Sequence, residues 1–178
     1  RKINNNKINN NKINNSKNSQ QIDFSEKPNH FISLHFRIGD YAKLQQYHCL
    51  LNIQYYINAI KHIINKTNKD DWVILYCCEK NDLKMIQQKI KGMKNHFPNI
   101  VFERVSDNYQ DWEQMLIMSL CRHNIIANST FSWWSAYFND NEDKIVCCPK
   151  TWFGPANADK NTNDLYMEDW VKIENNIY

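Results

Sequence analysis

The sequence predicts an α/β domain in which a doubly wound parallel sheet, a Rossmann-like arrangement, is covered by helices on both faces. Short apolar runs such as residues 72–78 alternate with segments whose apolar residues recur every three or four positions. Apolar runs without polar alternation are typical of strands that are buried on both faces, as they are in a parallel sheet.

The first four elements follow from this alternation. A strand at 30–36 precedes a helix at 51–66, in which isoleucines recur at helical spacing, and the apolar run at 72–78 is the next strand. The helix predicted at 81–97 has the same apolar spacing, and Asn81 at its start is predicted to cap it.

The alternation continues to the end of the domain. A strand at 99–104 and a helix at 111–122 are followed by a short apolar strand at 124–127. A helix at 129–138 and a strand at 144–148 complete the pattern. Strands that are separated by crossover helices pair in parallel, so this order predicts the doubly wound sheet.

Basic residues are concentrated at the start of the chain. Residues 1–20 carry five of the 22 Lys and Arg and none of the 19 Asp and Glu, so the other 158 residues hold 17 bases against 19 acids. Residues 1–27 are predicted to be a disordered, Asn- and Lys-rich low-complexity tail, and residues 28–178 a single domain. A nearly neutral domain is not suited to binding nucleic acid, and no apolar run is long enough for a transmembrane helix.

The six cysteines and three glycines exclude several kinds of site. The cysteines include two adjacent pairs but no Cys-x-x-Cys, so they lack the spacing of zinc ligands, and we interpret them as reduced core thiols. Reduced thiols favour a reducing compartment such as the cytoplasm. Three isolated glycines cannot form the glycine-rich loops of dinucleotide or Walker-type phosphate sites.

The first candidate site segment follows the strand at 30–36. In doubly wound sheets, ligands bind beyond the carboxyl ends of the strands where the strand order reverses. His35, Arg37 and Asp40 lie at such an end, and Gly39 permits a tight turn that brings the carboxylate beside the cation. The grouping predicts either a site for an anionic ligand or a salt bridge that only fixes the loop.

The second candidate segment follows the strand at 124–127. Asn128 or Ser129 can cap the next helix, whose free N–H groups and positive dipole end then lie beside the hydroxyls of Thr130 and Ser132. Such a helix end binds phosphate without a glycine loop. The alternative is a capped helix that binds no ligand.

Aromatic residues of the helix at 129–138 divide into two groups. Phe131, Trp134 and Phe138 share one face, which predicts that they belong to the core. Trp133 lies off that face and is the better candidate for lining the site.

Carboxylates begin the helix at 111–122. Glu113 either accepts hydrogen bonds from a ribose, a base or a sugar hydroxyl, or only stabilises the helix dipole. The chain has no Asp-x-Asp, the usual ligand for a metal-bridged diphosphate. We therefore expect no metal and no cofactor, with Arg37 and a helix N-terminus stabilising a leaving diphosphate.

Three motifs occur in order over roughly residues 30–173. They are His35-x-Arg37-x-Gly39-Asp40, the run Met118–Tyr137 that contains Asn-Ser-Thr-Phe-Ser-Trp-Trp, and Pro149-x-x-Trp152-Phe153-Gly154-Pro155. Together they resemble glycosyltransferase family 11, the α-1,2-fucosyltransferases.

The resemblance implies the donor-binding half of a GT-B type fold, GDP-fucose as donor, a galactose-containing glycan as acceptor, inversion at the anomeric carbon and no metal. Arg37 matches the arginine that binds the donor β-phosphate, and His35 and Asp40 match positions beside it. The hydroxyl-rich turn that holds the diphosphate is matched by Ser129, Thr130 and Ser132.

A carboxylate must take the proton of the acceptor, and Asp40 is the first candidate, with Glu113 the second. The chain departs from the family pattern at two positions. Many members have a second Arg where this chain has Ile38, and many have Asp where it has Gln114. These departures predict altered recognition of the donor base or ribose.

The length predicts part of an enzyme. GT-B enzymes have two domains, whereas only low-complexity sequence stands ahead of residue 30. We expect the acceptor domain either to precede residue 1 or to be missing. The chain is accordingly predicted to be a fucosyltransferase or, alternatively, a truncated, non-catalytic module that binds a sugar nucleotide or a glycan.

Overall fold

A parallel sheet of six strands runs through residues 29–175, the part of the chain that the computed structural model describes. Its strands are β1 (Phe31–His35), β2 (Val73–Cys77), β3 (Val101–Arg104), β4 (His123–Ile125), β5 (Val146–Pro149) and β6 (Val171–Ile173). They lie in the order β3-β2-β1-β4-β5-β6, which is the Rossmann order. The predicted fold class is therefore confirmed, whereas the predicted tail at 1–27 lies outside the described residues.

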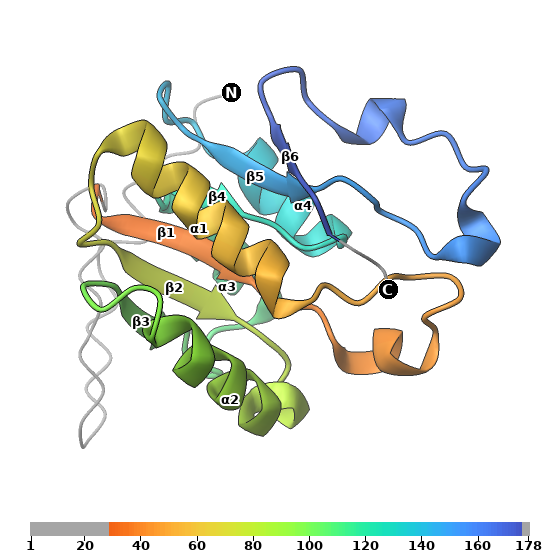
Figure 1. Ribbon diagram of the computed structural model, residues 1–178, viewed down its shortest axis with the longest axis horizontal. Helices are drawn as coiled ribbons and strands as arrows, with labels where there is room; N and C mark the ends of the chain where they lie inside the picture. The colour runs from red at the N-terminus through yellow and green to blue at the C-terminus, as the bar shows by residue number, and fades with distance from the viewer. Residues whose placement is uncertain (1–28, 176–178) are drawn as a thin grey trace.

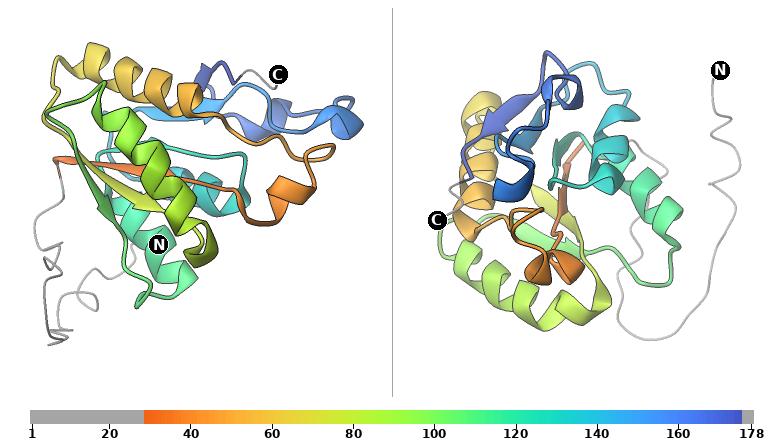
Figure 2. Two further views of the ribbon diagram at one scale, coloured as in Figure 1. Left: turned by 60° about the horizontal axis from the view of Figure 1, so that its bottom comes forward. Right: turned by 90° about the vertical axis from the view of Figure 1, so that its right-hand side faces the viewer.

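Within the described residues, four α-helices cover the two faces of the sheet (Figures 1 and 2). Helices α1 (Ile53–Thr67) and α2 (Leu83–Lys94) lie on one face, and α3 (Asp111–Leu120) and α4 (Thr130–Tyr137) on the other. None of these helices is long and apolar enough to cross a membrane. Both faces of the sheet are thus covered. A ligand can therefore approach the sheet only where its strands begin or end, and in such folds it binds at the carboxyl ends.

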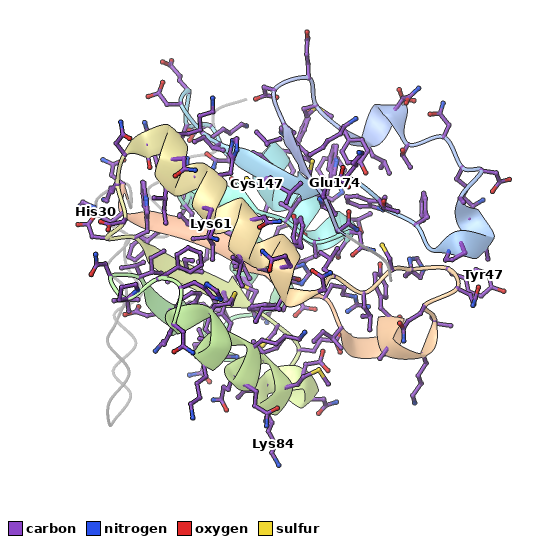
Figure 3. All side chains as sticks on the ribbon, viewed as in Figure 1. His30, Tyr47, Lys61, Lys84, Cys147 and Glu174 are labelled. Carbon is purple, nitrogen blue, oxygen red and sulfur yellow. The ribbon has the colours of Figure 1, made fainter. Side chains whose placement is uncertain are left out.

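The face beneath α1 and α2 holds the largest hydrophobic cluster. Ile32 and Ile74 from the strands meet Ile60 of α1 and Ile86 of α2, and all four side chains are fully buried. Each such side chain contributes about 1.5–3 kcal/mol through its burial. Figure 3 shows how densely side chains fill this layer. The apolar spacing of both helices therefore predicts the core correctly.

Two local predictions differ from the structure. Asn81 does not cap α2, because a 3₁₀ turn at Lys80–Asp82 takes up these residues and the helix begins at Leu83. Strand β6 was not predicted, because its three residues include a lysine and give no apolar run.

The prediction that one aromatic face of α4 belongs to the core is wrong for two of its three residues. Trp134 and Phe138 are 44% and 47% exposed, and only Phe131 packs inward, against His35. The residues that α4 buries are small, and they let the helix approach its neighbours: Ser132, Ser135 and Ala136. Because two of these buried residues are serines and the exposed ones are aromatic, the usual rule that the apolar side of a helix is buried predicts the wrong side.

All six cysteines lie within the described residues and are free thiols, as the sequence predicts. Five of them are buried. Burial raises the pKa of the Cys77 thiol to about 12 and that of Cys148 to about 12. These groups are therefore protonated core residues and not nucleophiles.

A buried amide joins β1 to β4. Asn124 and Ser33 are register partners in these strands, and Asn124 Nδ2 donates to Ser33 Oγ at 2.7 Å and to the Met118 carbonyl at 2.9 Å. Asn124 Oδ1 accepts from Asn139 Nδ2 at 2.6 Å. Asn124 and Ser33 are fully buried, so every polar atom in this network depends on its protein partner.

Replacing Asn124 with Leu is expected to lower the free energy of unfolding by roughly 3 kcal/mol or more, because three buried groups lose a partner at about 1–3 kcal/mol each. Urea unfolding of the full chain measures the loss. Asn65→Leu, at an exposed position of α1, is the control and should change stability by less than about 0.5 kcal/mol. Equal losses in the two variants would contradict the role of the network.

Candidate functional site

The loops that follow β1 and β4 meet at the carboxyl edge of the sheet. These strands are neighbours, and the strand order reverses between them. The first loop carries Arg37 and the second leads into α4. Tyr41 of the first loop donates its hydroxyl hydrogen to the carbonyl of Asn128 at 3.2 Å. The structure therefore brings together the two segments that the sequence predicts as a site.

Arg37 is the central cation of this edge. Its guanidinium forms ion pairs with Asp40 and with Glu79, and it lies over the ring of Tyr41 at 4.8 Å from the centroid. The Arg37–Asp40 salt bridge that the sequence left open is thus present. The arginine side chain is nevertheless 25% exposed and Asp40 is 58% exposed, so an incoming anion can reach the guanidinium and replace a carboxylate.

Glu79 was missed by sequence reasoning. It follows β2 after one residue, at the same edge of the sheet as Arg37. Asp82 of the same connection accepts a hydrogen bond from the backbone N–H of Gly39 at 2.7 Å. The signal that could have identified both acids is their position directly after the most apolar strand, since carboxyl ends of parallel strands meet at one edge.

Gly39 makes the close approach between these two loops possible. Its φ is +36°, in the left-handed region, and a Cβ built there would lie 2.5 Å from Glu79 Oε1. A side chain at this position would therefore strain the backbone and displace the glutamate from Arg37.

His35 is a neutral, buried neighbour of the cation. Its ring packs against Phe131 with 5.1 Å between centroids, and its Nδ1 has no hydrogen-bond partner among the described residues. Burial, together with the positive charge of Arg37, lowers the His35 pKa to about 3. The imidazole is uncharged at neutral pH and cannot serve as a cationic phosphate ligand in this arrangement.

The turn before α4 has a buried and an open part. Asn128 donates to the carbonyls of Cys49 at 3.0 Å and Trp152 at 2.9 Å, and Ser132 Oγ accepts from the Ala127 N–H at 3.2 Å. These two predicted ligands are fully or almost fully buried and build the turn.

Ser129 and Thr130 form the open part. Thr130 is exposed and Ser129 is half-buried. The hydroxyl of Ser129, the N-cap residue, makes no capping hydrogen bond within the described residues. The N-terminal N–H groups of α4 are thus not satisfied by this side chain, so the helix end can accept a ligand anion.

Two further predicted site residues are engaged in packing and capping. Trp133 donates its indole N–H to the Leu165 carbonyl at 2.6 Å, and its ring packs against Trp170. Glu113 accepts from the Gln110 N–H at 2.8 Å at the start of α3. Of the two roles that the sequence allows for Glu113, the structure therefore shows the second, which is to stabilise the start of α3.

Metal ligands do not gather at this edge. Across residues 29–175 there is no group of three or more His, Cys, Asp or Glu side chains arranged to hold a metal ion. The chemistry that these residues provide is electrostatic: a guanidinium, a helix N-terminus and exposed carboxylates.

The sequence was also compared with known proteins. The sequence profile described as Glycosyl transferase family 11 matches residues 7–174. The chain belongs to glycosyltransferase family 11. The O-antigen biosynthesis glycosyltransferase WbnK of Escherichia coli is 34% identical over 144 residues, covering 79% of this chain and 44% of that protein. The alpha-1,2-colitosyltransferase of Escherichia coli is 29% identical over 152 residues, covering 80% and 47%.

The family 11 chain therefore spans a little under half the length of these curated relatives. No solved structure matches it significantly.

All three family 11 motifs meet at the carboxyl edge. The first starts at the last residue of β1, the second runs from the end of α3 through β4 into α4 and crosses this edge in the turn before α4, and the third begins at the end of β5. Gly154 of the third motif donates its N–H to the Tyr47 carbonyl at 2.9 Å, and a Cβ on this glycine would lie 2.4 Å from the carbonyl oxygen of Gln45. The third motif thus supports the loop that carries Arg37.

Gly39→Ala is expected to destabilise the family 11 domain by about 1–2 kcal/mol, because alanine is strained in the left-handed region. Urea unfolding measures the change. Gly92→Ala is the matched control: this glycine is inside α2, and the nearest atom to its Cβ would be Ile53 Cδ1 at 3.4 Å. Helix propensity predicts that the control is neutral or stabilising by up to about 1 kcal/mol. Stabilisation of both variants would contradict the assigned role of Gly39.

His35 is expected to make stability depend on pH. Because its pKa is about 3 in the folded protein and 6.5 ordinarily, the unfolded chain binds the proton first, and stability falls as the pH is lowered through this window. The wild type should therefore lose about 2 kcal/mol more than His35→Gln between pH 6 and pH 4. Urea unfolding at several pH values tests this, and parallel curves would contradict it.

Proposed function

We propose that this chain is the donor-binding part of an inverting α-1,2-fucosyltransferase, which moves fucose from GDP-fucose to a galactoside hydroxyl without a metal. The observation that carries the proposal is the link from Arg37 through Tyr41 to the turn that begins α4. A guanidinium and a helix N-terminus are protein groups that bind a diphosphate without a cation. Membership of family 11 supports glycosyl transfer as the reaction.

In the proposed complex, the donor β-phosphate takes the place of Asp40 and Glu79 as the partner of Arg37. Ser129 and Thr130, with the N–H groups of the first turn of α4, donate to the remaining diphosphate oxygens. The carboxylates occupy the guanidinium in the structure, so donor binding is an exchange of anionic partners. This exchange frees Asp40 at the moment when the sugar is in place.

In the proposed reaction, the acceptor hydroxyl oxygen forms a bond to the anomeric carbon of fucose as the bond from that carbon to the β-phosphate oxygen breaks. The leaving GDP takes the bonding electrons, and Arg37 and the helix end stabilise the negative charge that grows on it. Asp40 takes the proton from the acceptor hydroxyl. Asp40 is preferred to Glu113 because Glu113 caps α3.

The names of the relatives indicate a second candidate for the transferred sugar. One relative is named for the transfer of a colitosyl group and the other for O-antigen biosynthesis. We propose fucose first, on the motifs that resemble the α-1,2-fucosyltransferases, and colitose as the competing sugar on the same nucleotide. Parallel assays with the two donors separate these alternatives, because each would support turnover with only its own sugar.

Arg37→Ala is expected to weaken binding of GDP and GDP-fucose by roughly 10- to 100-fold, which corresponds to about 1.5–3 kcal/mol for a hydrogen bond to a charged group. Isothermal calorimetry on the full chain measures both affinities. Lys61→Ala removes one positive charge from the exposed side of α1 and should leave both affinities unchanged (Figure 3). Equal GDP affinity in wild type and Arg37→Ala would overturn the assignment of Arg37 to the phosphate.

A non-catalytic module is the second candidate function, and the observation that favours it is the coverage of under half of each relative. Transfer to lactose-like acceptors, assayed with the same chain, distinguishes the two. Donor binding with turnover supports the enzyme. Donor binding without turnover supports the module for this chain and leaves the assignment of Arg37 intact.

A further inference from the structure

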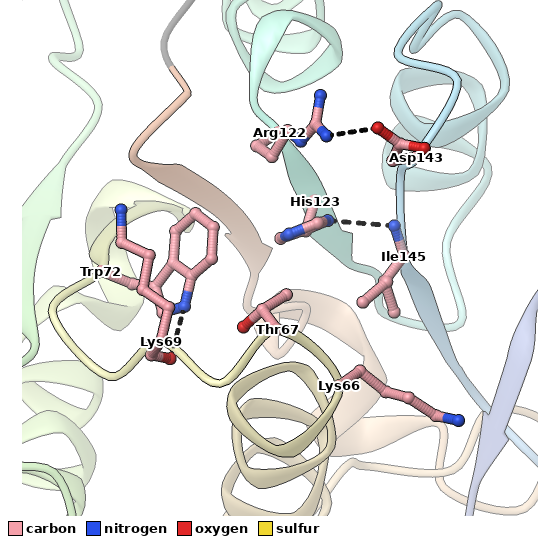
Figure 4. Close-up of a pocket in the computed structure, with 8 residues that line it drawn as sticks. All are labelled: Lys66, Thr67, Lys69, Trp72, Arg122, His123, Asp143 and Ile145. Carbon is pink, nitrogen blue, oxygen red and sulfur yellow. Dashed lines mark hydrogen bonds and ion pairs between the residues drawn. The ribbon is translucent and has the colours of Figure 1, made fainter.

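A concave site lies at the amino edge of the sheet, opposite the edge that carries Arg37. It is a cavity of about 400 Å³ bounded by the last turn of α1 and by the amino ends of β2, β4 and β5 (Figure 4). Arg122 and His123 fall within the second family 11 motif, Met118–Tyr137, but none of the predicted site residues contributes to the wall. The cavity is therefore separate from the predicted donor site.

The wall of this cavity is positively charged. Lys66, Lys69 and Arg122 line it together with one acid, Asp143. The formal charge of the wall is thus +2, whereas the C-terminal end of α1 contributes only about −0.5. Lys69 already has partners: its ammonium lies 2.7 Å from His30 Nδ1, 4.3 Å from the centroid of the Trp72 ring and 3.7 Å from Asp71, whose carboxylate is 73% exposed and screened by water. It therefore contributes charge to the wall more than free donors.

Arg122 keeps donors for a ligand. It reaches Asp143 through one nitrogen, with Nη2 donating to Oδ2 at 2.8 Å. Asp143 is 81% exposed and is free to turn away into solvent, whereas the arginine is 28% exposed. A guanidinium has five N–H donors in a fixed plane, so this contact leaves others for an anion.

His123 adds a neutral donor beside these cations. Its Nδ1 accepts from the Ile145 N–H at 3.0 Å, so the ring proton is carried by Nε2 (Figure 4). Burial, with the charges of Arg122 and Lys69, lowers the His123 pKa to about 4, so the ring is neutral at pH 7. The wall thus offers both cations and a neutral N–H.

We propose that this cavity binds the phosphate monoester of a small polar molecule of monosaccharide size. The phosphate would take its hydrogen bonds from Arg122, while Lys66 and Lys69, whose side chains extend to opposite sides of the cavity in Figure 4, would add positive charge around it. The volume exceeds that of a bare phosphate and lies near the lower end of small-molecule sites. Trp72 is 3% exposed and His123 2%, so the wall presents no ring face on which a nucleobase could stack.

The test follows backbone amide signals by NMR in the full chain at low ionic strength. Inorganic phosphate, glucose 6-phosphate and uncharged glucose are added in turn. Saturable shifts at Thr67 and His123 are expected with both phosphates, with tighter binding of glucose 6-phosphate, and no shift is expected with glucose. Signals of Ser129 and Thr130 distinguish this site from the Arg37 edge, so failure of one site is not confused with failure of the other.

Arg122→Gln should weaken binding of glucose 6-phosphate at least 10-fold, and Lys61→Gln, which removes a charge outside the cavity, should not change it. Lys66→Gln is a second test at an exposed position whose replacement does not disturb the core. The proposal is overturned if the amides of Thr67 and His123 do not shift, if Arg122→Gln and Lys66→Gln bind as the wild type does, or if Lys61→Gln is equally impaired. Equal affinity for inorganic phosphate and glucose 6-phosphate would overturn the inference that the ligand is of monosaccharide size.

Discussion

The hydrogen bond between Asn124 and Ser33 is the interaction on which the arrangement of the site depends. Strand β4 is short, and only three residue pairs align it with β1. A slip of one residue would turn every side chain of β4 to the opposite face of the sheet. Apolar residues at Ile125 and Leu34 would tolerate several alignments, whereas a buried amide with a hydroxyl partner is satisfied in one.

That alignment determines which loops meet at the carboxyl edge. With β4 fixed against β1, the turn before α4 reaches the loop of Arg37, and Asn128 then joins three segments. Its side chain donates to the carbonyls of Cys49 and Trp152, and its own carbonyl accepts from Tyr41. Its Oδ1 is buried without a partner among the described residues, a cost of about 1–3 kcal/mol. Such costs are typical of functional sites, and here it accompanies the positioning of Ser129.

Five of the six strands, the four α-helices and the meeting of the two predicted segments could be predicted from the sequence, because periodicity and the rule for parallel sheets are local or topological. Asp40 was predicted as a partner of Arg37, whereas its second partner, Glu79, was not. Glu79 is 42 positions away, and its contact depends on the positive φ of Gly39, which allows two loops to approach. The exposed faces of Trp134 and Phe138 were also beyond prediction, because α4 buries the side that carries Ser132 and Ser135 and exposes aromatic residues, the reverse of the usual pattern.

Ile38 shows how this chain holds its site loop without the second arginine of many family members. The side chain is 9% exposed and joins the cluster beneath α1, so apolar burial of about 1.5–3 kcal/mol anchors the loop. One consequence is electrostatic. Arg37 alone faces Asp40 and Glu79, which gives a formal balance of −1.

A diphosphate approaching this chain must therefore displace a carboxylate before it gains the cation. In the proposed complex, binding would depend correspondingly more on uncharged donors, the hydroxyls of Ser129 and Thr130 and the first N–H groups of α4. These donors are fixed by the helix and need no exchange of partners. On the proposed function, recognition of the donor thus depends on the helix end as well as on paired charges.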